Sequence, residues 1–295
     1  MEKYLLSCES PVDLSYSYVN ERGISVINYY YLIDGEPHID DMGKDPNSLN
    51  KFYQFLKEGK LPSTSQVNEF QYEEYFRNLL KQGHNVLHIA FGSGMTQSVN
   101  QAYLAAETVR KEFPNQDLII IDSVCSSSGY GMLVDDAYDL MQEGKDIKEI
   151  VSWIEENKTK IQHQFYSTDL KYLKRGGRVS GPAATVGSIL HVCPLMRLNY
   201  AGRIIAYSKV IGKKKAIKSI VDEMEAHAEN GLNYAGKVFI SNSNCLADAE
   251  MCKQEILKRF PNVKDVKIFD IGTVIASHTG PGTVALFFHG DERIK

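Results

Sequence analysis

The chain has 295 residues, of which 43% are hydrophobic and 24% are charged, and its formal net charge is -4 at pH 7. This composition is typical of a folded globular protein with room for two domains, and it argues against a disordered or fibrous chain. The mildly acidic balance also argues against nucleic-acid binding, which calls for a basic face.

The beginning of the chain resembles no signal peptide, and no apolar run approaches the roughly 18 residues that a membrane span requires. We therefore expect a cytoplasmic protein. The five cysteines are scattered and lack the paired spacing of metal ligands. We expect reduced thiols and no metal site.

The first half of the chain alternates patterns typical of strands and helices. Short apolar runs end at glycine or polar turns, Asp34-Gly35 predicts a hairpin, and longer stretches carry apolar residues at helical spacing. The predicted strands are 3–7, 85–90 and 117–121, the hairpin is 29–39, and the predicted helices are 47–58, 71–82, 99–113, 132–141 and 147–161.

Residues 62–66, Pro-Ser-Thr-Ser-Gln, interrupt this alternation with a cluster of hydroxyls. Proline and serine favour turns and helix caps, so we expect a loop here that caps the next helix.

The turn at residues 91–98, Phe-Gly-Ser-Gly-Met-Thr-Gln-Ser, joins a buried strand to a long helix. Free backbone N–H groups and the positive end of a helix meet at such a junction and favour an anion. The hydroxyls of Ser93, Thr96 and Ser98 could donate to a carboxylate or phosphate, or one of them could simply cap the helix.

A second junction of this kind follows strand 117–121, at Asp122 and residues 126–129, Ser-Ser-Ser-Gly. The carboxyl ends of parallel strands lie at the same edge of a sheet, where ligands bind in open α/β sheets. We therefore expect the two junctions to border one crevice.

The second half of the chain contains three further segments of interest. Residues 172–179 form a basic glycine turn, which is usually a solvated loop, although the arginine guanidinium suits oxyanions. Residues 182–196 are mostly small and apolar and predict a buried helix or one wall of an apolar cavity. Residues 275–282, Ile-Ala-Ser-His-Thr-Gly-Pro-Gly, predict a constrained loop on which His278 contacts a ligand or has a structural role.

The other elements of this half alternate again between strand and helix. The predicted strands are 203–211, 237–241, 266–271 and 283–289, and the predicted helices are 213–227 and 247–260. We expect an α/β fold of two α/β domains. Residues 1–160 would hold a mostly parallel sheet flanked by helices, residues 161–295 a mixed sheet, and a ligand would lie between them.

Four separated motifs, at residues 62–66, 91–96, 173–178 and 277–282, resemble those of the DegV family of bacterial fatty-acid-binding proteins. The resemblance implies a non-catalytic carrier, without cofactor or metal, that encloses one long-chain fatty acid. It also implies an ATP-binding fatty acid kinase subunit as partner, which phosphorylates the presented carboxylate for phospholipid synthesis. A peripheral membrane contact would serve lipid exchange.

By position, the resemblance assigns the carboxylate to a set of small polar residues and a histidine: Thr64, Ser65, Ser93, Gly94 and His278. It gives Arg175 and Arg178 a role at the head group or at the kinase-docking face, and residues 182–196 the acyl tunnel. The chain departs from the family at Cys8-Glu9-Ser10, where Thr-Asp-Ser is common, which leaves the role of this acidic position open.

Two other functions compete with this interpretation. A serine acyl hydrolase would use Ser93 as nucleophile, His278 as base and Asp122 as orienting acid, but the turn lacks the Gly-x-Ser-x-Gly pattern of a nucleophile elbow. A phosphate or nucleotide site at the same turn would lack both the Walker lysine and a dinucleotide fingerprint.

Overall fold

The computed structural model describes residues 4–179 and 191–295. A four-stranded sheet of order β2-β1-β6-β7, parallel at every pair, forms the amino-terminal part. Its strands are β1 (Tyr4–Glu9), β2 (Ser25–Ile27), β6 (Asn85–Ala90) and β7 (Leu118–Asp122). β6 is buried along almost its whole length because helices cover both faces of the sheet.

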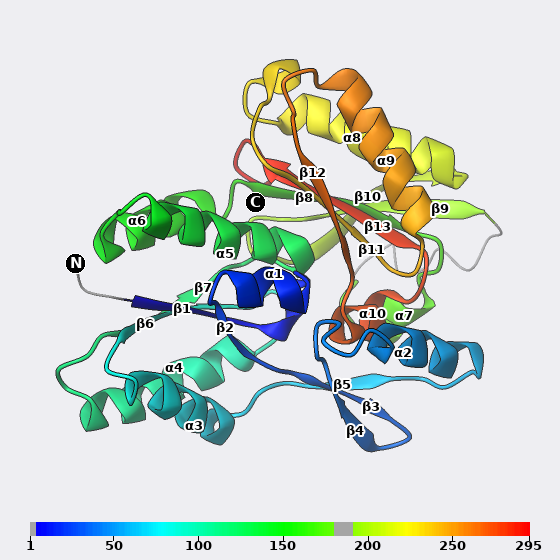
Figure 1. Cartoon of the computed structure of the whole chain (residues 1–295). Coiled ribbons are helices and arrows are strands. Elements are labelled where there is room, and N and C mark those ends of the chain that lie inside the picture. Colours follow the sequence, from blue (N-terminus) through cyan, green and yellow to red (C-terminus); the bar gives the residue numbers. More distant parts are fainter. Residues whose placement is uncertain (1–3, 180–190) are drawn as a thin grey trace.

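The helices of this part lie on opposite faces of the parallel sheet (Figure 1). α3 (Glu69–Leu80) and α4 (Ser98–Glu112) cover one face, and α5 (Ser127–Gln142) and α6 (Ile147–Asn157) cover the other. The shorter η1 (Ser10–Val12) and α1 (Tyr16–Glu21) follow β1.

A six-stranded mixed sheet of order β10-β9-β8-β13-β11-β12 forms the second part. Only the β11–β12 pair is parallel among its described pairs. The strands are β8 (Ile161–Ser167), β9 (Val192–Leu198), β10 (Ile204–Ile211), β11 (Val238–Asn242), β12 (Val266–Asp270) and β13 (Thr283–His289). One face carries α8 (Lys213–His227) and α9 (Leu246–Arg259), and η3 (Gly231–Asn233) precedes β11 (Figure 1).

Helix α5 packs between the two sheets, and two glycines permit its close approach. A Cβ at Gly129 would lie 2.4 Å from His163 Nε2 on β8, and one at Gly131 would lie 2.7 Å from the Val12 carbonyl oxygen. Tyr130, between them, donates its hydroxyl proton to the Ile89 carbonyl on β6. The helix therefore contacts both halves of the molecule.

A third, three-stranded antiparallel sheet of order β4-β3-β5 lies beside the parallel sheet (Figure 1). It contains the predicted hairpin, as β3 (Tyr30–Ile33) and β4 (Glu36–Ile39), and precedes α2 (Ser48–Lys57). Its third strand, β5 (Ser63–Ser65), corrects the loop expected at residues 62–66, because Tyr30 to Leu32 offer it a strand edge to pair with. Asn68, not this segment, caps α3.

Three other predicted elements differ from the structure. The helix expected over 147–161 ends at Asn157, and Ile161 begins β8. The loop expected over 275–282 is largely helical, since α10 spans Thr273–Thr279 and only the glycines beyond it turn into β13. Within the apolar segment 182–196, residues 192–196 belong to β9 rather than to a helix, because they pair with β8 and β10. Residues 180–190 lie outside the described part.

The α/β class, the parallel first sheet and the mixed second sheet are confirmed. The division into domains near residue 160 stays a prediction. All five cysteines are free, and four of them are buried. Within residues 4–179 and 191–295, no helix is long and apolar enough to span a bilayer.

Candidate functional site

A cavity of about 460 Å³ opens where the three sheets meet. This volume falls within the range of small-molecule sites. Most of its wall surface is apolar, and the apolar lining residues include Phe91, Phe165, Ile204, Val274, Ala285 and Phe287. Gln66, Gln97 and Arg178 also line it and are exposed, so they mark its mouth.

A hydroxyl and an imidazole from distant parts of the chain meet at the cavity wall. Thr64 projects from β5 and His278 from the last turn of α10, and their Oγ1 and Nε2 atoms lie 2.8 Å apart. Burial, with the positive charges of Arg178 and Arg175, lowers the pKa of His278 to about 4. The imidazole is therefore neutral at pH 7, which leaves one ring nitrogen as donor and the other as acceptor.

The start of α10, which carries His278, is held by two buried aspartates. Asp13 accepts the Gly272 N–H at 2.9 Å, and Asp40 accepts the Thr273 N–H at 3.1 Å and its hydroxyl at 2.8 Å. Burial raises the pKa of both carboxyl groups. Sequence patterns do not reveal this anchor, because its partners are more than 230 residues apart.

Only some backbone N–H groups of the turn after β6 are used within the described part of the chain. Phe91 N–H donates to Glu9, and Ser93 N–H donates to Asp122. Gly92 N–H donates to the Cys125 carbonyl, and Met95 N–H donates to the Gly92 carbonyl. Gly94 N–H has no hydrogen-bond partner among the described residues, and Gly94 lines the cavity. An unpaired backbone donor of this kind is available to a ligand.

The glycines of this turn are required by close packing of backbones. A Cβ at Gly92 would lie 2.6 Å from the Cys125 carbonyl oxygen, and one at Gly94 would lie 2.3 Å from the Gly202 carbonyl oxygen. Gly202 belongs to the β9–β10 turn, so the second sheet supports the turn from behind.

The three hydroxyls that the sequence singled out in this turn have different environments. Thr96 accepts the Ser98 N–H at 3.2 Å just before α4, but the N-cap residue of α4 is Gln97, which makes no side-chain cap bond, so none of the three hydroxyls is the helix cap. Ser98 is buried against Tyr72, 3.0 Å away. The Ser93 hydroxyl has no partner in the described part and lines the cavity. Ser126 and Ser127 line the same cavity, so the expectation of one crevice for both junctions is confirmed.

The remaining predicted site residues separate into two groups. Arg178 lines the cavity, but Arg175 donates to the Pro62 carbonyl at 2.6 Å and to the Ser277 carbonyl at 3.4 Å, linking the β5 segment to α10. Ser65 is exposed, lies outside the cavity wall, and donates to the Gln66 carbonyl at 3.3 Å. Thr64, Ser93, Gly94 and His278 are brought together.

The geometry does not support the hydrolase alternative. Asp122 accepts the N–H groups of Ser93 at 3.0 Å and Val124 at 2.9 Å, so it holds the turn and does not orient a histidine. His278 Nε2 is bonded to Thr64. Ser93, His278 and Asp122 therefore do not form the hydrogen-bonded chain that a serine hydrolase requires.

Metal ligands are not clustered at the cavity or elsewhere in the described chain: no group of three or more His, Cys, Asp or Glu side chains there could hold a metal ion. His163, the other imidazole of the wall, uses both nitrogens internally, with Nδ1 2.9 Å from the Ile161 carbonyl and Nε2 accepting the Ser126 N–H. Burial keeps the pKa of His163 well below its usual value.

A parallel sheet and a mixed sheet flanked by helices, with a largely apolar cavity bordered by hydroxyls and an imidazole, define a cavity-forming α/β protein. The family model described as "Uncharacterised protein, DegV family" matches residues 6–291, nearly the whole chain. The chain therefore belongs to the DegV family.

Relatives and solved structures agree with this assignment. A DegV domain-containing protein of Clostridium perfringens is 39% identical over 99% of both chains. A DegV family protein from Thermus thermophilus, described as fatty-acid binding, is 27% identical, with a TM-score of 0.85 over 98% of this chain and 100% of that one. The fatty acid binding DegV family protein of Streptococcus agalactiae is 28% identical, with a TM-score of 0.82 over 99% and 100%.

Proposed function

We propose that this protein binds one long-chain fatty acid in the cavity, with the carboxylate at Thr64, Ser93, Gly94 and His278. The observation that carries the proposal is the arrangement of an unpaired amide and an unpaired hydroxyl on the wall of an apolar cavity. Fatty acid binding by the similar Thermus and Streptococcus proteins supports it.

The two ends of such a ligand contribute differently to binding. A hydrogen bond to a charged group contributes about 1.5 to 3 kcal/mol, and each buried methylene about 0.8 kcal/mol before the cost of ordering the chain. The tail therefore supplies most of the affinity, and the polar residues fix the position of the carboxylate.

The carboxylate would lie next to the mouth, since the exposed Gln66, Gln97 and Arg178 border the same cavity. We infer that the protein presents it to an ATP-binding kinase subunit in the cytoplasm, for conversion to an acyl phosphate. In this step a carboxylate oxygen bonds to the γ-phosphorus of ATP and ADP leaves. The carrier itself supplies no catalytic group.

The test of presentation is a phosphotransfer assay with oleate-loaded protein, ATP and the kinase subunit, in which hydroxylamine captures the acyl phosphate as a hydroxamate. We expect hydroxamate that depends on all three components. Loaded protein that yields none with an active kinase subunit would contradict presentation, but not fatty acid binding.

A further inference from the structure

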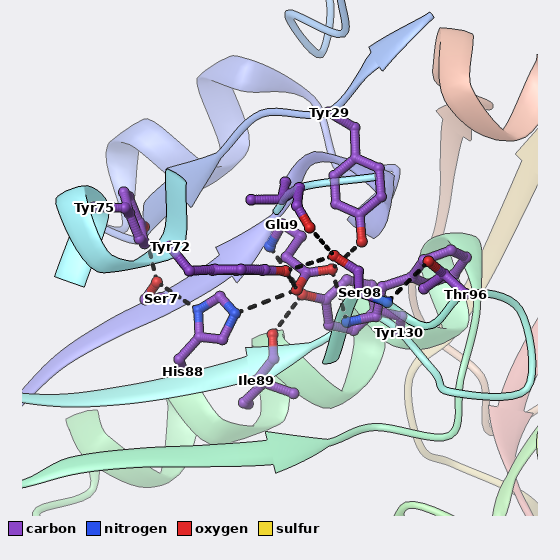
Figure 2. A network of polar contacts seen from close by, with 12 residues as sticks. Ser7, Glu9, Tyr29, Tyr72, Tyr75, His88, Ile89, Thr96, Ser98 and Tyr130 are labelled. Atoms are coloured by element: carbon purple, nitrogen blue, oxygen red, sulfur yellow. Dashed lines mark hydrogen bonds and ion pairs between the residues drawn. The ribbon is translucent and has the colours of Figure 1, made fainter. Parts of the chain in front are cut away.

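Glu9 ends β1 and is completely buried (Figure 2). Its Oε2 accepts the Phe91 N–H at 3.1 Å and the Tyr29 hydroxyl at 2.9 Å. Its Oε1 accepts the Tyr72 hydroxyl and lies 3.3 Å from His88 Nε2. Both carboxylate oxygens therefore have two partners, which offsets the large cost of burying a carboxyl group.

The network continues past His88 to Ser7 and Tyr75 (Figure 2). Ser7 Oγ lies 2.9 Å from His88 Nδ1 and 2.8 Å from the Tyr75 hydroxyl. With Tyr75 donating to Ser7 and Ser7 donating to Nδ1, the ring N–H on Nε2 points to Glu9. In this order Tyr75, Ser7 and His88 each donate one hydrogen bond to the next group, and the last acceptor is Glu9.

On the other side, the network reaches the cavity turn at two points. Glu9 binds the first amide of the turn, at Phe91, and Tyr72 contacts Ser98 at the start of α4. Ser98 N–H in turn donates to Thr96. The turn is thus held at both ends by this network, and Asp122 holds its middle through Ser93 N–H.

We propose that Glu9 is a positioning residue for carboxylate recognition: it holds the turn so that Gly94 N–H and the Ser93 hydroxyl face the ligand. This inference rests on the proposed function. Glu9 does not line the cavity, and it acts on the ligand through the backbone of the turn.

Glu9→Gln tests this role with little change in volume. An amide oxygen accepts at most two hydrogen bonds and its nitrogen only donates, so at least two of the four donors around Glu9 lose this acceptor. The experiment measures the dissociation constants of oleate and oleyl alcohol, which share one tail, on the delipidated full-length protein. We expect the preference for oleate over the alcohol to fall about tenfold, with the alcohol bound as before.

Two neighbouring tyrosines of α3 provide a matched pair of further variants. Tyr72→Phe removes the hydroxyl that joins Glu9 to Ser98, and we expect it to lower the preference as well. Tyr75→Phe removes a hydroxyl of the same network that contacts Ser7 and not Glu9, and we expect an unchanged preference. If Glu9→Gln does not fold, the role of Glu9 is tested by these two variants alone: a lower preference for oleate in Tyr72→Phe than in Tyr75→Phe supports it, and equal preferences contradict it.

Unchanged preference in both Glu9→Gln and Tyr72→Phe would overturn the role of Glu9. So would an equal loss of acid and alcohol binding, because that is the result of a general structural defect. A wild-type protein that does not prefer oleate would instead overturn the proposed head-group site itself.

Discussion

Thr64 and Ser93 reach the cavity from different sheets, and each carries a hydroxyl suited to a carboxylate oxygen. Thr64 already shares a hydrogen bond with His278, whereas Ser93 has none in the described part of the chain. Ser93 is therefore the residue whose hydroxyl gains most from a bound anion, because it exchanges no internal bond for the new one.

We expect Ser93→Ala to weaken oleate binding about tenfold and Thr64→Ala somewhat less, because a charge-assisted hydrogen bond is lost while the tail contacts remain. Isothermal calorimetry with oleate and oleyl alcohol measures both effects. Ser65→Ala is the matched control, since this neighbouring serine is exposed and lies outside the cavity wall. Equal affinities for all three variants and the wild type would remove these hydroxyls from the site.

His278 gives the site a titration that NMR can follow. In the unliganded protein its pKa should be about 4, because burial and two arginines disfavour the imidazolium. A carboxylate bound beside it favours the imidazolium, so oleate should raise this pKa and oleyl alcohol should not. A pKa that oleate leaves unchanged would place the head group elsewhere.

The lowered pKa of His278 in the unliganded protein also affects the stability of the fold. The folded-state pKa lies below the ordinary value of 6.5, so the unfolded chain binds the extra proton between pH 6.5 and 4. This residue therefore contributes a loss of stability as the pH falls through that window. In urea titrations, His278→Gln should lose less unfolding free energy than the wild type between these pH values.

At the scale of elements, the polar border of the cavity depends on contacts between segments that belong to different sheets. The β6–α4 turn packs its backbone against the β9–β10 turn at Gly94 and Gly202. β5 and α10 approach each other through Thr64 and His278, and Arg175 links the segments that flank them. A change in any of these contacts displaces a polar group of the cavity wall.

Gly94→Ala should separate the two turns, because its Cβ would lie 2.3 Å from the backbone oxygen of Gly202. We expect a loss of about 3 kcal/mol in unfolding free energy, together with weaker oleate binding. Gly83→Ala is the control: its Cβ meets no atom within 4 Å, and it carries only the strain of a φ of +84°. That strain costs about 1 kcal/mol. Equal losses in the two variants would show that the close contact at Gly94 is unimportant.

The sequence correctly predicts the helices and strands that are defined by residues close together in the chain. The hairpin at Asp34-Gly35, the strand 85–90 and the helix 213–227 are confirmed because alternation, turn residues and helical spacing suffice to define them. β5 and α10 differ from the prediction because both depend on partners far along the chain. A serine- and proline-rich segment becomes a strand only when β3 offers its edge.

The same limit applies to the site residues. The four residues predicted for the head group all line the cavity: Ser93 and Gly94 are predicted from a strand-to-helix turn, and Thr64 and His278 from motifs that resemble those of the family. Glu9, Tyr72 and His88 come from three separate elements, and no spacing in the sequence indicates that they meet. The anchoring of α10 by Asp13 and Asp40 is hidden for the same reason.

At the scale of the whole molecule, the cavity exists only when all three sheets are assembled. Ser93 comes from the end of the parallel sheet, Thr64 from the small antiparallel sheet, and Phe165 and Ala285 from the mixed sheet. A ligand that binds this assembly and not the unfolded chain stabilises all three together. The cavity and its polar border are therefore properties of the complete fold.

The most direct test of the central claim is native mass spectrometry of the full-length protein, combined with analysis of its organic extract. We predict one long-chain fatty acid per chain in the purified protein, its loss on delipidation, and its return on addition of oleate or palmitate. Protein that carries no fatty acid and takes up neither one after delipidation would contradict the proposed function.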